Sequence, residues 1–409
     1  MVNQLMQKKI KSICVIIILT VLLSGCWDAR ELSDIAIATA LGVDKEGDQI
    51  LVSAQILNPG EIAGNTISTR TAVSTYQAKG STFFEAIRKL TTIAPRRIYL
   101  AHLRMIILGE EFARGGVADV LDFISRDHEM RTDFNFAIAR ENTAENVVQV
   151  LTPLEKIPAN KIFGNLQAAE ESWAGVSAVK LDELIASMTS KGKEASVTGL
   201  WVIGDPEFGT QLENVEASLS PTEIKTDFIG VFKNDRFVDW LNEEQSKTLN
   251  RIKNKVKNTI SWVPCDDGGK VAIEVFKTHA NVSGSMKKGI PKINVDVKSE
   301  ANVGDVACAL NLTKPKELRK LESKFEKSIE EEMKTSIKKI QEMGTDVFGF
   351  GEVIHRASPK EWKKVKGQWN EIFANELEVK VNVKIKIRRT GTINQSFLKE
   401  IEEKRKQGE

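Results

Sequence analysis

The first 26 residues predict that this chain begins as an exported precursor. Residues 1–11 carry three lysines and no acidic side chain, and residues 13–23 (ICVIIILTVLL) are almost entirely apolar. As a helix these eleven residues would be about 17 Å long, whereas a bilayer core of about 30 Å needs roughly twenty residues. A short apolar run after a basic start is typical of a secretory signal peptide. We therefore predict that residues 1–25 are a signal peptide.

Cys26 ends the tetrad Leu23-Ser24-Gly25-Cys26, which matches the lipobox of bacterial lipoproteins. In such proteins the cysteine is diacylated and becomes the mature N-terminus. The alternative is an ordinary thiol, but the basic start, the short apolar run and the tetrad occur in the correct order for a lipoprotein. Two or three acyl chains anchor a protein stably, whereas one chain binds a membrane only marginally. We predict lipidation at Cys26.

No Ser/Gly-rich tether follows the proposed anchor. Nine residues lie between Cys26 and Ala36, where a strand pattern begins, so even a fully extended chain places that strand within about 35 Å of the anchor. The first domain is therefore expected close to the membrane.

The charge balance argues against nucleic acid as a partner. The chain has 58 basic and 56 acidic side chains, and the signal peptide holds three of the basic ones, which leaves 55 against 56. No run of basic residues persists in the mature chain, so no field is present that would hold nucleic acid. The remaining length, about 380 residues, exceeds one comfortable hydrophobic core and predicts more than one domain.

The patterning divides the mature chain into three segments and predicts an α+β (mixed α/β) fold of three domains, each a β-sheet flanked by helices. The segments are an N-terminal α/β domain at 26–194, a small middle domain at 195–262 and a C-terminal domain at 263–409. In the first segment, apolar runs on both sides of a Gly-containing turn near residue 47 predict a β-hairpin. Strand and helix patterns then alternate, as in α/β folds.

The third segment contains the longest predicted helix, over residues 314–342. Its apolar side chains recur every three or four residues as one continuous stripe, which are Leu318, Leu321, Phe325, Ile329, Met333, Ile337 and Ile340. A coiled-coil partner could cover this stripe, but the alternating strands on both sides favour packing against the chain's own sheet. Strict alternation over residues 378–387 predicts the strand that completes this sheet.

Two cysteines, Cys265 and Cys308, remain once Cys14 and Cys26 are accounted for. An exported protein can form a disulfide between them, but spacing alone does not establish the required geometry. We expect two separate thiols here and keep the disulfide as the alternative.

A search for reactive constellations gives no catalytic residue, no metal site and no cofactor, so an enzyme is not expected. The four histidines are not paired in any zinc-binding spacing, and no nucleophile elbow is present. The glycines of GFGEV, residues 349–353, lack the rest of a phosphate-binding loop and are interpreted as a turn before a strand. The charged run RDHEMRTD, residues 126–133, is most simply an ion-paired surface turn. Its alternative is a contact surface in which Arg126, Asp127 and Arg131 meet a partner protein.

The stretch GCWDARELSDIAIATALGVD resembles the mature N-terminus of the Ger(x)C family, the C-subunit lipoproteins of spore germinant receptors. The residues that carry this resemblance are Cys26, Trp27, Asp28, Glu31, Gly42, Val43 and Asp44. Further similar motifs follow in the same order, namely RRIYLAHLRMIILGEEFARGGVADVLDFISRDHEMR, GLWVIG, GVFKNDRFVDWLNEEQS and GFGEVIHRASPKEWKKVKGQWNEIF.

The resemblance implies a non-catalytic lipoprotein on the outer face of the spore's inner membrane. It implies two membrane-embedded partners, the A and B subunits of a receptor that senses a nutrient and triggers germination, and three mixed α/β domains. The competing hypothesis is a lipid-anchored extracytoplasmic solute-binding protein that captures the nutrient itself. Such a protein needs a cleft with several convergent polar and aromatic groups, and aromatic residues make up 6% of this chain. The receptor subunit is therefore the favoured hypothesis.

Overall fold

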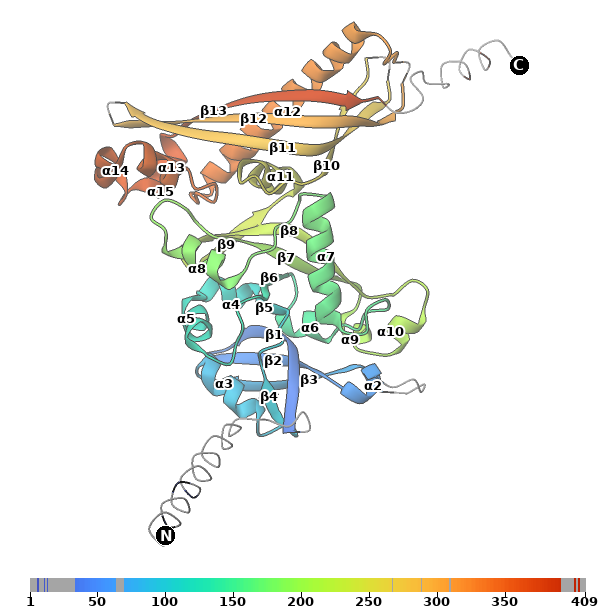
Figure 1. Cartoon of the computed structure of the whole chain (residues 1–409), viewed down its shortest axis with the longest axis vertical. Coiled ribbons are helices and arrows are strands. Elements are labelled where there is room, and N and C mark those ends of the chain that lie inside the picture. Colours follow the sequence, from blue (N-terminus) through green and yellow to red (C-terminus); the bar gives the residue numbers. More distant parts are fainter. Residues whose placement is uncertain are drawn as a thin grey trace.

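Two β-sheets with surrounding helices build the two halves of the molecule, stacked along its long axis (Figure 1). The structure is a computed structural model that describes residues 34–63, 70–266, 268–287, 289–308 and 310–390, with isolated residues 6, 11, 13, 401 and 404. The α+β fold class predicted from the sequence is confirmed.

The first sheet has nine strands in the order β3-β2-β1-β5-β6-β7-β8-β9, with β4 paired beside β1. Its strands are β1 (Ile35–Glu46), β2 (Gln49–Leu57), β3 (Val73–Gly80), β4 (Arg97–Tyr99), β5 (Met105–Gly109), β6 (Asn135–Arg140), β7 (Ser196–Ile203), β8 (Glu223–Lys233) and β9 (Arg236–Leu241). The predicted hairpin around residue 47 is the antiparallel β1–β2 pair. The central strands β1, β5, β6 and β7 are parallel.

Helices cover both faces of the parallel centre, as the near-continuous apolar strands require. One core lies under α3 (Phe83–Leu90), α4 (Glu110–Gly115), α5 (Ala118–Arg126) and α8 (Leu181–Thr189). The other lies under α6 (Ala144–Gln149) and α7 (Pro158–Ser172). Three short helices, α2 (Pro59–Ala63), α9 (Pro206–Gly209) and α10 (Glu213–Glu216), lie in connections.

The middle segment does not have a sheet of its own, which corrects the expectation of one sheet per segment. Its strands β7, β8 and β9 extend the first sheet, because β7 pairs in parallel with β6 and antiparallel with β8. The open edge of a sheet presents unpaired backbone N–H and C=O groups to which a further strand can pair. The sequence pattern of a strand therefore does not show whether the strand starts a new sheet or extends the existing one. The division into three domains stays a prediction.

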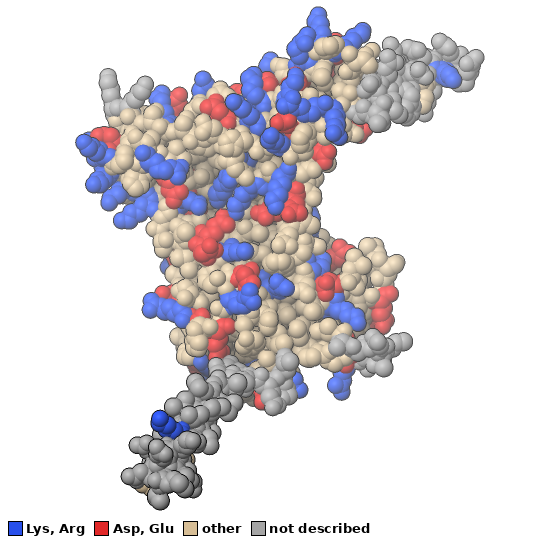
Figure 2. All heavy atoms as spheres, in the orientation of Figure 1, with Lys and Arg blue, Asp and Glu red and all other residues tan. Residues whose placement is uncertain are grey.

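The second sheet has four strands in the order β10-β11-β12-β13 and belongs to the C-terminal half. They are β10 (Thr259–Pro264), β11 (Lys270–Lys287), β12 (Ile290–Val306) and β13 (Glu378–Arg389). Helices α12 (Pro315–Glu342), α13 (Phe350–Ala357), α14 (Pro359–Val365) and α15 (Trp369–Asn375) complete this half. Figure 2 shows many Lys and Arg side chains over the same half of the molecule.

Helix α12 packs against its own sheet, as predicted. Six of the seven predicted stripe residues are buried, and Leu318 is half-buried against the same core. Its Glu322 and Glu326 side chains also reach the edge strand β13. They accept hydrogen bonds from the N–H groups of Ile387 (3.0 Å) and Ile385 (3.1 Å). The helix therefore covers backbone donors that an open edge would offer to another chain.

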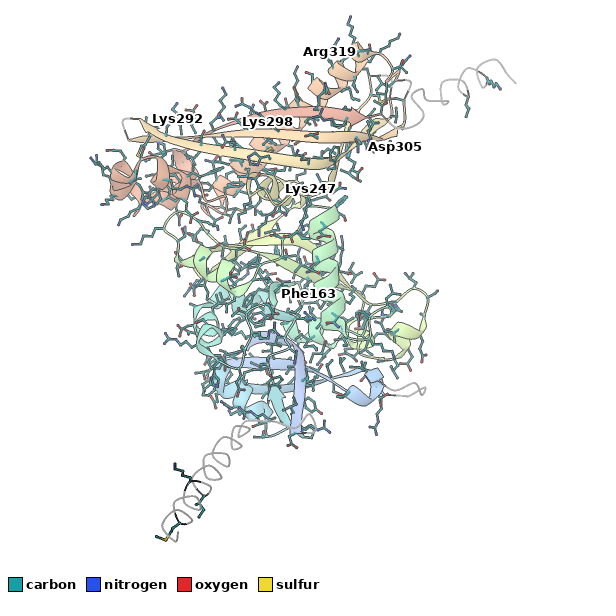
Figure 3. All side chains as sticks on the ribbon, viewed as in Figure 1. Phe163, Lys247, Lys292, Lys298, Asp305 and Arg319 are labelled. Carbon is teal, nitrogen blue, oxygen red and sulfur yellow. A yellow bond between two sulfur atoms is a disulfide. The ribbon has the colours of Figure 1, made fainter. Side chains whose placement is uncertain are left out.

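A zone that we call the joint connects the two halves and comprises α11 (Glu243–Ile252), residues 190–194 and residues 345–353. Helix α11 lies between the sheets (Figure 1), and Leu249 and Ile252 share one core with β8, β9 and the second sheet. Lys247 of α11, labelled in Figure 3, pairs with Glu243 (2.8 Å) and lies 3.7 Å from the centre of the Trp173 ring after α7.

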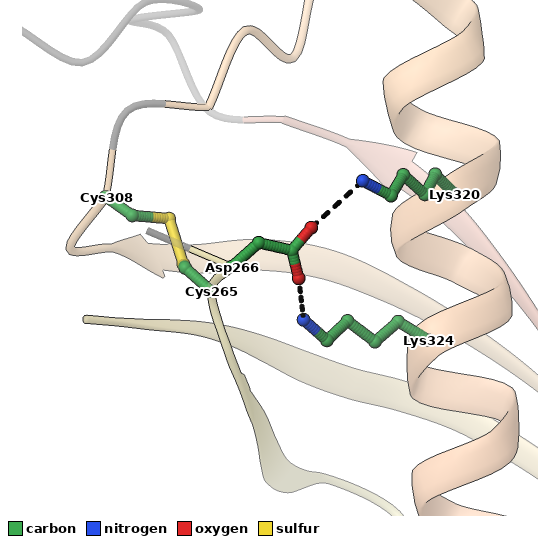
Figure 4. Close-up of a disulfide and its surroundings, with 5 residues drawn as sticks. All are labelled: Cys265, Asp266, Cys308, Lys320 and Lys324. Atoms are coloured by element: carbon green, nitrogen blue, oxygen red, sulfur yellow. Dashed lines mark hydrogen bonds and ion pairs between the residues drawn. A yellow bond between two sulfur atoms is a disulfide. The ribbon is translucent and has the colours of Figure 1, made fainter. Parts of the chain in front are cut away.

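A disulfide joins Cys265 and Cys308, so the expectation of separate thiols is wrong (Figure 4). Cys265 follows β10 and Cys308 follows β12, and both strands end where β11 begins. The N–H of Cys265 donates to Gly269 and the N–H of Ala307 to Lys270, which brings the two cysteine Cα atoms to 6.4 Å. The register of β11 with its two neighbours creates this proximity across 43 residues.

Candidate functional site

The amino ends of the parallel strands form the surface closest in sequence to the proposed anchor. β1 begins at Ile35, which pairs with Arg97 of β4, and the amino ends of β5 and β6 lie at the same end of the sheet. Cys26 lies outside the described residues. Eight chain steps separate it from Asp34, where the description of this half begins, and such a stretch spans at most about 28 Å. We call this region the amino-end surface; it comprises the start of β1, β4 and residues 126–134.

The charged turn predicted as a partner contact is part of the amino-end surface, because it connects α5 to β6. Arg126 pairs with Asp122 (2.9 Å) and Arg131 with Asp133 (3.1 Å). Asp127 accepts a hydrogen bond from the N–H of Glu129 at 2.7 Å, and Glu129 also pairs with Arg97 of β4. These side chains therefore neutralise one another locally. Exposed pairs of this kind contribute little to stability, so a partner could replace them at low cost.

A cleft of about 720 Å³ opens beside the start of β1. Part of its polar wall is hydrogen-bonded internally, since the Asn58 amide donates to the Thr71 carbonyl (2.7 Å) and to the Ser74 hydroxyl (3.0 Å). Nearby, Ile62 of α2 is 38% exposed and Ile93, just after α3, is 56% exposed. The end of the molecule that carries the charged turn thus also presents apolar side chains to its surroundings.

The Gly42-Val43-Asp44 motif is a structural connection at the opposite, carboxyl ends of the parallel strands. The Asp44 carboxylate is buried and accepts hydrogen bonds from the N–H groups of Ala144 and Glu145, both at 2.8 Å, at the start of α6. Burial raises the pKa of Asp44 despite these two donors. A Cβ at Gly42 would lie 3.1 Å from the Ala144 backbone, and one at Gly109 only 2.1 Å from Asp44 Oδ1. A side chain at Gly109 would therefore displace the Asp44 carboxylate, and one at Gly42 would push α6 slightly away from β1.

Two buried carboxylates hold the joint together. Asp346 accepts the backbone N–H groups of the three residues 349–351 (2.7–3.0 Å) and the Trp369 indole N–H (2.8 Å). Burial raises the pKa of Asp346 to about 6. Glu194 accepts the N–H of Asn234 (2.7 Å) and the Asn370 amide (3.2 Å), and burial raises its pKa as well. Because Asn234 belongs to the first half and Asn370 to the second, Glu194 fastens the two halves to each other.

The interpretation of residues 349–353 as a turn before a strand is wrong, because these residues begin α13. Gly349 has φ +79°, a conformation that favours glycine, and Asp346 binds the free N–H groups of the first helical turn. The aspartate lies outside the GFGEV motif and is fully buried, so the motif alone did not reveal the helix start.

The described part of the chain shows neither a metal-ligand cluster nor a membrane-spanning helix. It contains no group of three or more His, Cys, Asp or Glu side chains that could hold a metal ion. None of its helices is both long enough and apolar enough to cross a bilayer.

The whole described chain is similar to known germination proteins. Residues 28–200 match the sequence model of the spore germination protein N-terminal domain, and residues 228–391 match that of the spore germination B3/GerAC-like C-terminal domain. Spore germination protein KC of Bacillus subtilis (strain 168) is 32% identical over 393 residues, which are 93% of this chain and 96% of the relative. The chain belongs to the Ger(x)C family of spore germination proteins.

Other relatives agree with the family assignment. Spore germination protein B3 of the same organism is 26% identical over 379 residues, with 91% of this chain and 95% of the relative covered. The crystal structure of the GerBC protein matches with a TM-score of 0.51 and 21% identity, over 85% of this chain and 96% of that chain. This likeness shows a common Ger(x)C fold.

Proposed function

We propose that this Ger(x)C protein is the non-catalytic, lipid-anchored C subunit of a nutrient germinant receptor, acting with A and B membrane subunits on the outer face of the spore's inner membrane. The observation that carries the proposal is the 32% identity to a germination protein over 93% of the chain. The lipobox ending at Cys26 supplies the membrane attachment in this proposal.

The short connection to the anchor gives the proposal a physical rationale. A tether of eight chain steps between Cys26 and Asp34 confines the amino-end surface to the vicinity of the bilayer. Confinement of this kind raises the effective concentration of that surface for partners embedded in the same membrane, without any new contact. The charged turn at Arg126, Asp127 and Arg131 is the contact that we propose within this surface.

Substitution of the anchor cysteine tests the attachment. Cys26→Ala should leave an unprocessed precursor and weaken the nutrient-triggered germination response, because no thioether to the lipid can form. Cys14→Ala is the matched control, because Cys14 lies within the predicted signal peptide and should leave processing unchanged. A Cys26→Ala protein that is still cleaved after Gly25, or still carries lipid by mass spectrometry, would refute the anchor.

Charge reversal in the turn tests the contact surface. Arg131→Glu should reduce recovery of the A and B subunits when the protein is affinity-purified from cross-linked spore membranes, because an acidic partner group would then face a like charge. Arg319→Glu is the control, since Arg319 lies on α12 in the half remote from the amino-end surface (Figure 3). Equal recovery with both variants would remove the turn from the interface.

A further inference from the structure

A cavity of about 380 Å³ lies in the joint, at the meeting point of both halves, and we call it the joint cavity. The connection between α8 and β7, the end of α11, strand β11 and helix α13 all contribute to its walls. Nothing in the proposed role at the membrane requires this cavity, and its volume is within the range of small-molecule sites.

Positive side chains outnumber negative ones in the joint cavity. Four cations line it, Lys193, Lys253, Lys255 and Arg356, against two carboxylates, Glu183 and Glu352. The buried Asp346 also interacts electrostatically with Lys253, and its oxygens already accept four N–H donors.

Of the two carboxylates that line the cavity, one forms an ion pair with a lining cation. Lys255 pairs with Glu183 (2.7 Å), whereas Lys253 has only the neutral hydroxyl of Ser196 at 3.2 Å. Glu352 accepts the Ser190 hydroxyl at 2.8 Å rather than a cation. Among the residues that the structure describes, Lys193 and Arg356 form no ion pair or hydrogen bond through their side chains.

The cavity walls are held in place by direct contacts between the two halves. The N–H of Glu352 donates to the Gly192 carbonyl (3.1 Å), and the N–H of Glu194 donates to the Asp346 carbonyl (2.9 Å). Gly192 and Gly351 touch so closely that a Cβ on Gly351 would lie 2.6 Å from Gly192 Cα. The backbone segments that carry Lys193 and Arg356 are thus fixed relative to each other, although the Arg356 side chain is exposed.

The pKa of Lys253 reflects both its burial and its cationic neighbours. Burial, together with the neighbouring ammonium groups of Lys255 and Lys193, lowers the pKa of Lys253 to about 7. An anion placed among these groups would relieve their repulsion and favour the charged ammonium.

We propose that the joint cavity binds a small oxyanion, carrying a phosphate or carboxylate group, between Lys193, Lys253 and Arg356. Arg and Lys side chains are the groups that bind both of these anions in proteins. Since Lys193 and Lys253 come from elements adjoining the first sheet and Arg356 from α13 of the second half, the bound anion would connect the two halves.

Calorimetric titration of the full-length mature protein in uncharged detergent tests the proposal. Sodium phosphate and sodium succinate serve as separate probes, at about pH 6.5 and low ionic strength so that the charges are little screened. We expect saturable binding of at least one probe, and the comparison of the two distinguishes a phosphate ligand from a carboxylate ligand. Lys193→Met, which keeps the aliphatic stem beside Gly349, and Arg356→Gln should each weaken binding at least about tenfold.

Lys363→Met and Arg319→Gln are the matched controls, because both side chains are exposed, without a described partner and outside the cavity. The controls should change affinity by less than about twofold. Absence of saturable heat for both probes up to about 10 mM would overturn the proposal. Binding that survives both cavity variants, or that the controls weaken equally, would overturn it as well. The purified protein needs no partner subunit for this measurement, so its outcome is independent of the proposed receptor role.

Discussion

Replacement of Asp44 would measure how much the Gly42-Val43-Asp44 motif contributes to the stability of the first half. The Asp44 carboxylate lies between three elements, because it belongs to β1, lies close to Gly109 of β5 and accepts two N–H groups at the start of α6. The proposed perturbation is Asp44→Ala, with Asp44→Asn as an intermediate of nearly the same size.

The magnitude follows from the two hydrogen bonds of 2.8 Å that Asp44 accepts. A hydrogen bond to a charged group contributes about 1.5–3 kcal/mol, so the pair contributes about 3–6 kcal/mol before the cost of burying the carboxylate is subtracted. That cost is appreciable here, because burial raises the pKa of Asp44. We expect Asp44→Ala to lower the free energy of unfolding by about 2–4 kcal/mol. The free energy of unfolding of Asp44→Asn should lie between those of the parent protein and Asp44→Ala, since the amide oxygen still accepts one of the two N–H groups.

Urea denaturation followed by circular dichroism is a suitable assay. Asp48→Ala serves as the control, because Asp48 is exposed in the turn between β1 and β2 and its removal should change stability by less than about 0.5 kcal/mol. If Asp44→Ala proved as stable as the parent protein, the hydrogen bonds would merely balance the desolvation of the carboxylate. The interpretation of the motif as a stabilising connection would then be wrong.

Three further predictions concern the second half and the joint. Reduction of the Cys265–Cys308 disulfide should cost about 4 kcal/mol of stability, because the bond closes a 43-residue loop in the unfolded chain; a urea curve unaffected by reductant would contradict this. The double variant Glu322→Ala/Glu326→Ala should self-associate in light-scattering measurements, because N–H groups on the edge of β13 lose their acceptors; a monomer at the same concentration would argue against that role. Between about pH 7 and pH 10 the unfolded chain binds a proton at Lys253 that the folded chain has lost, so stability should rise with pH there. Lys253→Met should flatten that rise in urea titrations, and a rise of unchanged size would refute the pKa assignment.

Elements with a strong local pattern could be predicted from the sequence. The hairpin of β1 and β2 follows from apolar runs around Gly47, whose φ of +59° suits the turn. The stripe of α12 repeats over the 28 residues of the helix, enough to fix both its type and its buried face. In both cases the information lies within one contiguous stretch of chain.

Features that depend on strand register could not be predicted in the same way. Whether β7 starts a new sheet or joins β6 depends on which sheet edge is free in space, and no residue of β7 encodes that edge. Likewise, Cys265 and Cys308 meet only because β11 pairs with β10 on one side and β12 on the other. The spacing of residues along the chain shows neither the pairing of β7 with β6 nor the proximity of the two cysteines.

The buried charges of the joint were missed for a different reason. Asp346 is an isolated acidic residue in sequence, whereas Lys253 lies in an alternating basic stretch with Arg251, Lys255 and Lys257, and charged residues of both kinds would ordinarily be assigned to the surface. Their environment is created by segments distant along the chain, since Lys253 donates to the hydroxyl of Ser196, 57 residues away, and interacts electrostatically with Asp346. The glycines Gly192 and Gly351, which pack against each other, are a sequence signal of close backbone approach. A glycine in the sequence does not show, however, which distant segment it contacts.

The joint also constrains how the two halves can move relative to each other. Ile229 and Val231 of the first sheet share a hydrophobic core with Ile293 and Val295 of the second, so separating the halves would expose apolar surface at about 25 cal/mol per Å². A rigid-body opening is therefore costly. Small movements of side chains around the joint cavity expose less apolar surface than a rigid-body opening does. The cations there are only partly compensated, so a bound anion would change the balance of charge and could favour one arrangement. If a conformational change at the amino-end surface is transmitted to the second sheet, we expect the transmission through the joint to depend on Lys193 and its cationic neighbours. Variants of these residues that alter germination without altering the proposed membrane attachment would identify that route.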